Sequence, residues 1–199
     1  MKPNRIYFLA AALLLYAFPL YSQSNYRLAD DYTFVIHGSS NIRDWSESVD
    51  DVDGIANINI VDERHFDVEE VRILVRSSSI KSIGVEGTAM NKKTYETLKT
   101  IQYPMITFIV TTPLRSVAAN GRKIRIQADG MLTIAGVSKI ITLHPTIYAG
   151  RQGKINVEGD VFLKMSEFDI EPPVALFGLL RVKDSFTVHF KITLIPDMN

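Results

Sequence analysis

The stretch that decides the fold is Ser185–Leu194, which reads SFTVHFKITL and alternates polar and apolar residues throughout. A period of two places successive side chains on opposite faces of a β-strand, so this segment predicts a strand with one apolar face and one polar face. The apolar face carries Phe186, Val188, Phe190, Ile192 and Leu194. The polar face carries Ser185, Thr187, His189, Lys191 and Thr193.

The same alternation recurs along the chain between turn-forming pairs such as Asn120-Gly121 and Ala135-Gly136. Evenly spaced strands joined by short turns are typical of an all-β sandwich or barrel. We therefore expect about eight or nine strands. These strands are expected to come from ten candidate segments, which are residues 32–38, 42–49, 55–61, 71–76, 105–111, 123–127, 131–134, 139–143, 154–165 and 184–194.

Two segments depart from this alternation. Residues 91–99 bring Tyr95, Leu98 and Ile101 to helical spacing, which predicts a short helix capped by Asn91 or the preceding turn. Residues 168–178 contain paired prolines and an apolar cluster, and they predict a loop or a single helical turn just before the last strand.

The first residues have the pattern of a secretory signal peptide. Lys2 and Arg5 precede an apolar run over residues 6–20, and small and polar residues follow it. The run is shorter than the roughly 20 residues that cross a bilayer. We therefore expect a signal peptide over residues 1–23, a single domain over residues 24–199, and an exported protein, either periplasmic or secreted.

Composition excludes several classes of function. The chain has no cysteine, so it can form no disulfide, thiolate metal site or acylated-cysteine anchor. Loss of the leader would change 22 basic against 22 acidic residues to 20 against 22, a balance that suggests neither nucleic acid nor an anionic membrane surface as a partner. Without a cysteine to acylate, we expect no stable membrane anchor. The sequence is compatible with either a monomer or a homodimer.

No catalytic or metal-binding constellation is evident. The four histidines have no metal-ligand spacing, there is no Gly-x-Ser-x-Gly motif, and neighbouring acids on a strand point to opposite faces. We expect no catalytic residue, no metal, no cofactor and no enzymatic activity. The histidines are His37, His65, His144 and His189.

Large aromatic residues leave a choice between two roles. Trp45, Phe168 and Phe177 could cover an ordinary core, or they could form the wall or lid of a binding site at the mouth of a barrel.

Three segments carry a resemblance to a known family. They are YPMITF at residues 103–108, ADGMLTIAGVSKIITL at residues 128–143 and VEGDVFLKMSEFDI at residues 157–170. In order and spacing they resemble the YceI-like family of exported, lipocalin-like proteins. The resemblance implies an extended eight-stranded antiparallel barrel, with one short helix and an apolar loop, that holds a lipid, isoprenoid or quinone chain. Residues 29–33 and 88–93 depart from the family pattern, and these departures concern recognition of the ligand's head group.

A barrel of eight strands is either just filled by side chains or holds one small ligand. The residues alone leave both open, and the resemblance favours a carrier or sequestering protein with a cavity. The alternatives are an envelope interaction module with a packed barrel and an uncharacterised hydrolase. The expected ligand-binding residues are Phe34, Ile36, Trp45, Ile58, Val71, Ile73, Phe108, Ile124, Ile126, Val157, Val161, Phe168, Phe177, Phe186, Val188 and Phe190.

Overall fold

The computed structural model describes residues 23–84 and 87–197. The predicted signal peptide lies outside these residues except for Gln23, so its presence and cleavage stay predictions. None of the helices in the described part of the chain is both long and apolar enough to cross a bilayer.

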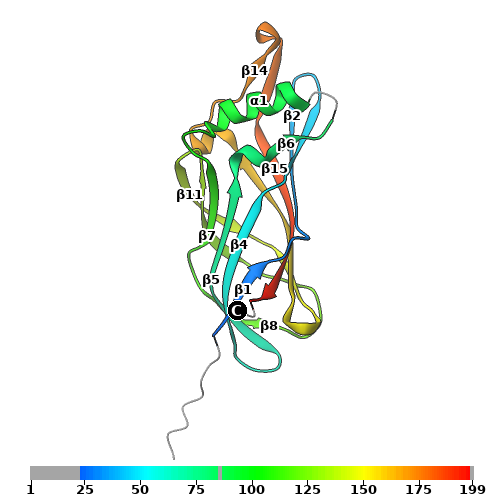
Figure 1. The fold of residues 1–199 in the computed structure, drawn as a ribbon, viewed down its shortest axis with the longest axis vertical. Coiled ribbons are helices and arrows are strands. Elements are labelled where there is room, and N and C mark those ends of the chain that lie inside the picture. The colour runs from blue at the N-terminus through cyan, green and yellow to red at the C-terminus, as the bar shows by residue number, and fades with distance from the viewer. Residues whose placement is uncertain (1–22, 85–86, 198–199) are drawn as a thin grey trace, which may run out of the picture.

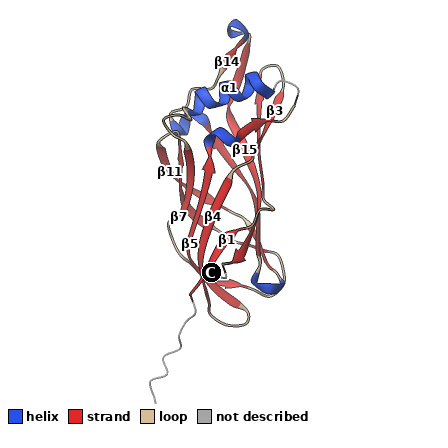
Figure 2. Ribbon diagram, viewed as in Figure 1, coloured by secondary structure: helices blue, strands red, loops and turns tan. Residues whose placement is uncertain are grey.

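Long strands run along an elongated molecule, with the one α-helix of the described residues lying across one end and the C-terminus at the other (Figure 1; Figure 2). The strands are β1 (Gln23–Leu28), β2 (Thr33–Ser40), β3 (Asp44–Val49), β4 (Val52–Ile60), β5 (His65–Arg76), β6 (Ile80–Ser82), β7 (Met105–Val110), β8 (Leu114–Ala118), β9 (Ile124–Arg125), β10 (Ala128–Ile134), β11 (Val137–Leu143), β12 (Thr146–Ala149), β13 (Ile155–Lys164), β14 (Val174–Ala175) and β15 (Leu180–Pro196). The helices are α1 (Gly87–Leu98) and the short 3-10 turns η1 (Ser77–Ser79), η2 (Arg151–Gly153), η3 (Met165–Phe168) and η4 (Leu176–Gly178).

The strands form one antiparallel sheet that rolls into a barrel. Its wall follows the order β11-β10-β7-β5-β4-β1-β15-β13, and β12 and β9 continue from β13. Strand β15 is central because β13 pairs along one of its edges, while β2 and β1 share the other edge. The fold class expected from the sequence is confirmed, although the sheet contains additional short strands.

The closing strand is longer than its predicted limits. It begins at Leu180 rather than Asp184, and Leu180 and Val182 extend the inward-facing apolar series. The pairing with β2 shifts register between Val182 and Phe186. The sequence pattern marks only the second part of the strand because Asp184, a polar residue, occupies the position between Val182 and Phe186 where the alternation calls for an apolar one.

One residue of the predicted polar face is not solvated. Thr193 is buried, and its hydroxyl donates a hydrogen bond to Oδ1 of Asn156 at 3.2 Å. It lies where β15 is paired on both edges, with β1 and with β13. Flanking strands therefore bury a side chain that alternation alone assigns to water.

Helix α1 differs from the predicted helix in its start and in its inner face. It begins at Gly87, and Asn91 is no cap, because its Oδ1 accepts a hydrogen bond from the amide of Ser82 at 2.7 Å. Ile101 is fully exposed. The residues that face the barrel include Met90 and Leu98, whose spacing places them on one side of the helix.

A buried apolar cluster lies at the end of the barrel where β1 begins and β15 ends (Figure 1). Side chains from several strands meet there and close the barrel, so this end forms the floor of the interior. The buried cluster comprises Tyr26, Ala56, Ile58, Phe66, Val68, Val117, Ile147, Ile155 and Leu194.

A second cluster seals the side of the barrel where β11, at one end of the rolled sheet, lies next to β13. Leu132 of β10 and Leu163 of β13 are buried there together with Phe168 and Ile170, which follow β13. Ile141 of β11 packs against the same cluster. Apolar side chains therefore join β11 to β13 at this seam.

Candidate functional site: an apolar cavity inside the barrel

The barrel encloses a cavity of about 850 Å³. Almost all of its lining is apolar, because the inward-facing positions of every long strand carry aliphatic or aromatic residues. A volume of this size lies within the range of pockets that hold small ligands. The structure therefore decides the question that the sequence left open: the barrel is hollow.

Glycines make room for the aromatic side chains of the wall. A methyl group on Gly130 would come within 2.3 Å of the Phe108 ring, and one on Gly159 would come within 3.0 Å of Phe190. The rings lie over bare backbone, which keeps them close to the wall and leaves the centre of the barrel free.

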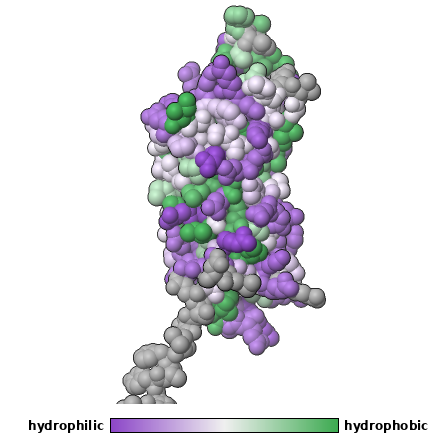
Figure 3. Space-filling view, viewed as in Figure 1, coloured by the Kyte–Doolittle hydropathy of each residue, from purple (hydrophilic) through white to green (hydrophobic). Residues whose placement is uncertain are grey.

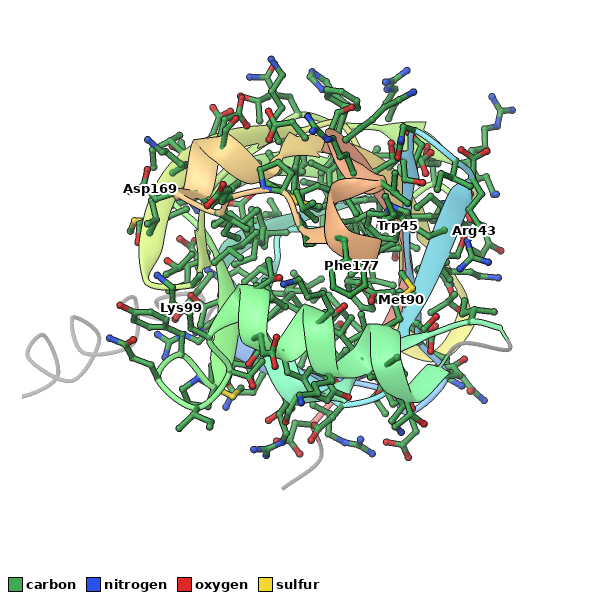
Figure 4. The ribbon with its side chains drawn as sticks, turned by 90° about the horizontal axis from the view of Figure 1, so that it is seen from above. Arg43, Trp45, Met90, Lys99, Asp169 and Phe177 are labelled. Carbon is green, nitrogen blue, oxygen red and sulfur yellow. The ribbon has the colours of Figure 1, made fainter. Side chains whose placement is uncertain are left out.

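The cavity opens at the end covered by α1. Among the residues that line it, those classed as exposed all belong to this end: the β2–β3 connection, α1 and the hairpin of β14 and β15. Figure 4 looks down on this end, with Arg43, Trp45 and Met90 on one side and Lys99 and Asp169 on the other. The exposed lining residues are Ile42, Arg43, Ala89, Lys93 and Ala175.

Above the mouth, the hairpin of β14 and β15 projects beyond α1 (Figure 1), and its tip is apolar (Figure 3). Phe177 at this tip is fully exposed and Leu179 is 72% exposed. The base of the hairpin is held by Asn41, whose side chain bonds the carbonyl of Leu179 and the amide of Arg181.

One carboxyl group lies in the cavity wall. Glu47 of β3 is only 4% exposed, and its Oε1 accepts a hydrogen bond of 2.5 Å from the hydroxyl of Thr94 on α1. Burial raises the pKa of Glu47, while the bond from Thr94 acts in the opposite direction. This pair joins the helix to the barrel wall.

Sequence analysis did not single out Glu47, although a signal for it exists. The alternation in Trp45-Ser-Glu47-Ser-Val49 places Glu47 on the same face as Trp45 and Val49. An acidic residue on an otherwise apolar strand face indicates either a site or a paired charge.

Most of the expected ligand-binding residues line the cavity. They are Phe34, Ile36, Trp45, Ile58, Val71, Ile73, Phe108, Ile126, Val157, Val161, Phe186, Val188 and Phe190.

Three of the expected residues do not line the cavity. Phe168 is 1% exposed and belongs to the seam, and Phe177 points into solvent at the hairpin tip. Ile124 packs against the floor cluster. An apolar residue of a loop or a short strand can fill any of these places, so composition alone could not separate them.

The histidines make local contacts. His189 lies 2.9 Å from Asp160, and His37 lies 2.8 Å from the hydroxyl of Ser46. Within residues 23–84 and 87–197, no three histidine, cysteine or acidic side chains come together in a way that could hold a metal.

Comparisons with solved structures show the same fold. The chain is 16% identical to a polyisoprenoid binding domain from Saccharophagus degradans implicated in plant cell wall breakdown, with a TM-score of 0.67, covering 86% of this chain and 98% of that one. It is 14% identical to Burkholderia cenocepacia BcnA, with a TM-score of 0.61 and coverage of 81% and 95%. It is 18% identical to the Campylobacter jejuni YceI protein, with a TM-score of 0.53 and coverage of 77% and 85%. No curated protein matches the chain.

The family comparison agrees with the fold and with the three sequence segments noted above. Residues 26–194, from within β1 almost to the end of β15, match the YceI-like domain. The chain belongs to the YceI-like family.

Proposed function

We propose that this protein binds a lipid whose long apolar chain, of the isoprenoid, quinone or acyl type, lies inside the barrel. The observation that carries the proposal is the cavity of about 850 Å³ with an apolar lining. The resemblance of the fold to a domain described as polyisoprenoid binding supports the same class of ligand.

Removal of the chain from water supplies the binding energy. Each buried methylene contributes roughly 0.8 kcal/mol before the costs of ordering the ligand are subtracted. This attraction has no direction, so the wall of the cavity selects for length and width of the chain. The contacts would come from the inward residues of β2, β5, β7, β13 and β15 that the sequence identified.

We further propose that the protein is exported and acts as a carrier or a sequestering protein. Export follows from the signal-peptide pattern of residues 1–23. A barrel that is hollow over much of its length does not suit the alternative of a packed interaction module. The family match and the apolar lining of the cavity favour binding over hydrolysis.

Blocking the cavity tests the proposal. Val188 lines the cavity from the middle of β15, so replacement by Trp would fill the space that the chain needs. We expect Val188→Trp to abolish displacement of a fluorescent long-chain alkyl probe by unlabelled lipid, as measured by fluorescence titration. Lys191→Trp is the matched control, because Lys191 lies on the exposed side of the same strand.

Circular dichroism and thermal melting would establish that both variants fold. Mass spectrometry of an organic extract of protein from its native envelope would identify the ligand. Equal probe binding by folded Val188→Trp and the wild type would contradict the proposal. The proposal would also fail if the extract of the native protein contained no stoichiometric lipid and the purified protein bound no probe.

A further inference from the structure

The polar groups that reach the cavity are gathered at one end of it. They all belong to residues 40–47 or to helix α1, while the rest of the wall is apolar. An apolar chain with one polar end would therefore be oriented by the cavity, with its head at the α1 end. The polar and charged lining residues are Ser40, Arg43, Glu47, Lys93, Thr94 and Thr97.

Glu47 is the most deeply buried of these charged groups. In the sheet it lies between Ile36 of β2 and Ser82 of β6, with its side chain turned to the interior. Thr94 supplies a donor to Oε1, and among the described residues no donor is found for Oε2. A buried carboxylate is stabilised by each further hydrogen bond, so Glu47 can accept one from a ligand.

A charged head group of either sign would have to give up its hydration to reach Glu47. A carboxylate or phosphate would approach the Glu47 carboxylate in a poorly solvated space, where like charges repel strongly. An ammonium group would pair with Glu47, but the loss of its hydration in this space offsets the gain. An uncharged hydroxyl group can donate to Glu47 without either penalty.

We propose that Glu47 and Thr94 form a head-group subsite for an uncharged hydroxyl, so that the preferred ligand is a long-chain alcohol or phenol. This inference rests on the proposed function, because it assigns one end of the ligand that the cavity holds. The hydroxyl donates to Glu47, and the chain extends from α1 toward the floor of the barrel.

Probes with one chain and different heads test the subsite. Hexadecanol, hexadecanoate, hexadecylamine and hexadecyl methyl ether would each compete with the same fluorescent alkyl probe for the full protein at neutral pH. We expect hexadecanol to bind at least about tenfold more tightly than each of the others. A tenfold difference in affinity is about what one hydrogen bond to a charged group contributes. The ether isolates the donated hydrogen bond, since it keeps the oxygen and lacks the proton.

Two substitutions at the subsite separate charge from hydrogen bonding. In Glu47→Gln the carboxylate charge is lost, and most of the handicap of hexadecanoate relative to hexadecanol should disappear. In Glu47→Leu the acceptor is lost as well, and hexadecanol should fall to the affinity of the ether. Glu158→Gln is the matched control, because Glu158 pairs with Lys123 and does not line the cavity.

The outcomes distinguish the subsite from the cavity. Equal affinity of the wild type for all four probes, or tighter binding of the acid or the amine, would overturn the subsite and leave the proposed function intact. Failure of folded wild-type protein to bind any of the four would overturn both.

Discussion

At the scale of single residues, the inner face of the wall pairs large rings with glycines. Trp45 of β3 lies directly opposite Gly38 of β2, and a methyl group on Gly38 would approach the indole within 2.1 Å. The pairing holds the ring flat against the wall near the mouth of the cavity. The role of Trp45 is therefore that of a wall residue, one of the two that its sequence context left open.

We expect Gly38→Ala to destabilise the protein by about 1–3 kcal/mol, because the Trp45 ring must move or the backbone must shift. Urea denaturation would measure the loss. Gly87→Ala is the control, since a methyl group there meets nothing within 4 Å. Replacement of Trp45 by Leu in the Gly38→Ala background should restore part of the lost stability. If it does not, the contact between the added methyl group and the Trp45 ring is not the cause of the destabilisation.

The stability effect of Glu47 depends on pH. Burial raises the pKa of Glu47 above its ordinary value of 4.5, so the folded state takes up a proton more readily than the unfolded state. The contribution of this group to stability therefore falls as pH rises from 4.5 through the raised pKa, and the buried charge is a cost at neutral pH.

Glu47→Gln should accordingly be more stable than the wild type at neutral pH, since the amide oxygen still accepts the bond from Thr94. The gain should shrink as pH approaches 4.5, in urea titrations of both proteins across that range. Glu158→Gln should show no such gain, because Lys123 lowers the pKa of Glu158 and its charge is favourable. A gain from Glu47→Gln that is constant with pH would contradict this account.

At the scale of elements, side chains complete what strand pairing leaves open. The seam between β11 and β13 is filled by the Phe168 side chain from η3. The turn η3 is in turn held to β15, because Asp184 accepts bonds from the amide and the hydroxyl of Ser166. These same bonds lower the pKa of Asp184.

Two phenylalanines of the same apolar loop should behave differently. Phe168→Ala should cost about 3–5 kcal/mol, because it removes a fully buried ring from the seam. Phe177→Ala should leave stability almost unchanged, because that ring is fully exposed. Chemical denaturation of both variants measures the contrast, and similar losses would show that the tip of the hairpin is packed in solution.

At the scale of the whole molecule, the barrel combines a packed floor with a hollow upper part. The floor and the seam contribute buried area that stabilises the fold, and the cavity is free for a ligand. A ligand that binds only the folded state adds to its stability in proportion to the logarithm of its concentration.

We expect a long-chain alcohol at about one hundred times its dissociation constant to stabilise the wild type by about 2.7 kcal/mol. The increment should appear as a concentration-dependent rise in Tm. It should be absent in Val188→Trp and present in Lys191→Trp. A rise of equal size in all three proteins would point to a binding site outside the cavity.

The sequence by itself determined that the chain forms long antiparallel strands and which side of each faces inward. Alternation is a local property, and it identified Phe34, Ile73, Phe108 and Val188 as inward residues without knowledge of their neighbours. Strand β1 and the short strands β6, β8, β12 and β14 escaped this reasoning, because they carry too little pattern and their pairing depends on distant partners.

Only the tertiary structure decided that the interior is hollow, where it opens and what its mouth contains. Whether inward side chains meet depends on the circumference of the wall and on how closely the rings lie against it, and both depend on residues far apart in sequence. The burial of Glu47 has the same origin, because the helix that covers it is separated from β3 by the intervening strands β4, β5 and β6. Alternation fixes the direction of a side chain, and the closure of the barrel fixes what that side chain meets.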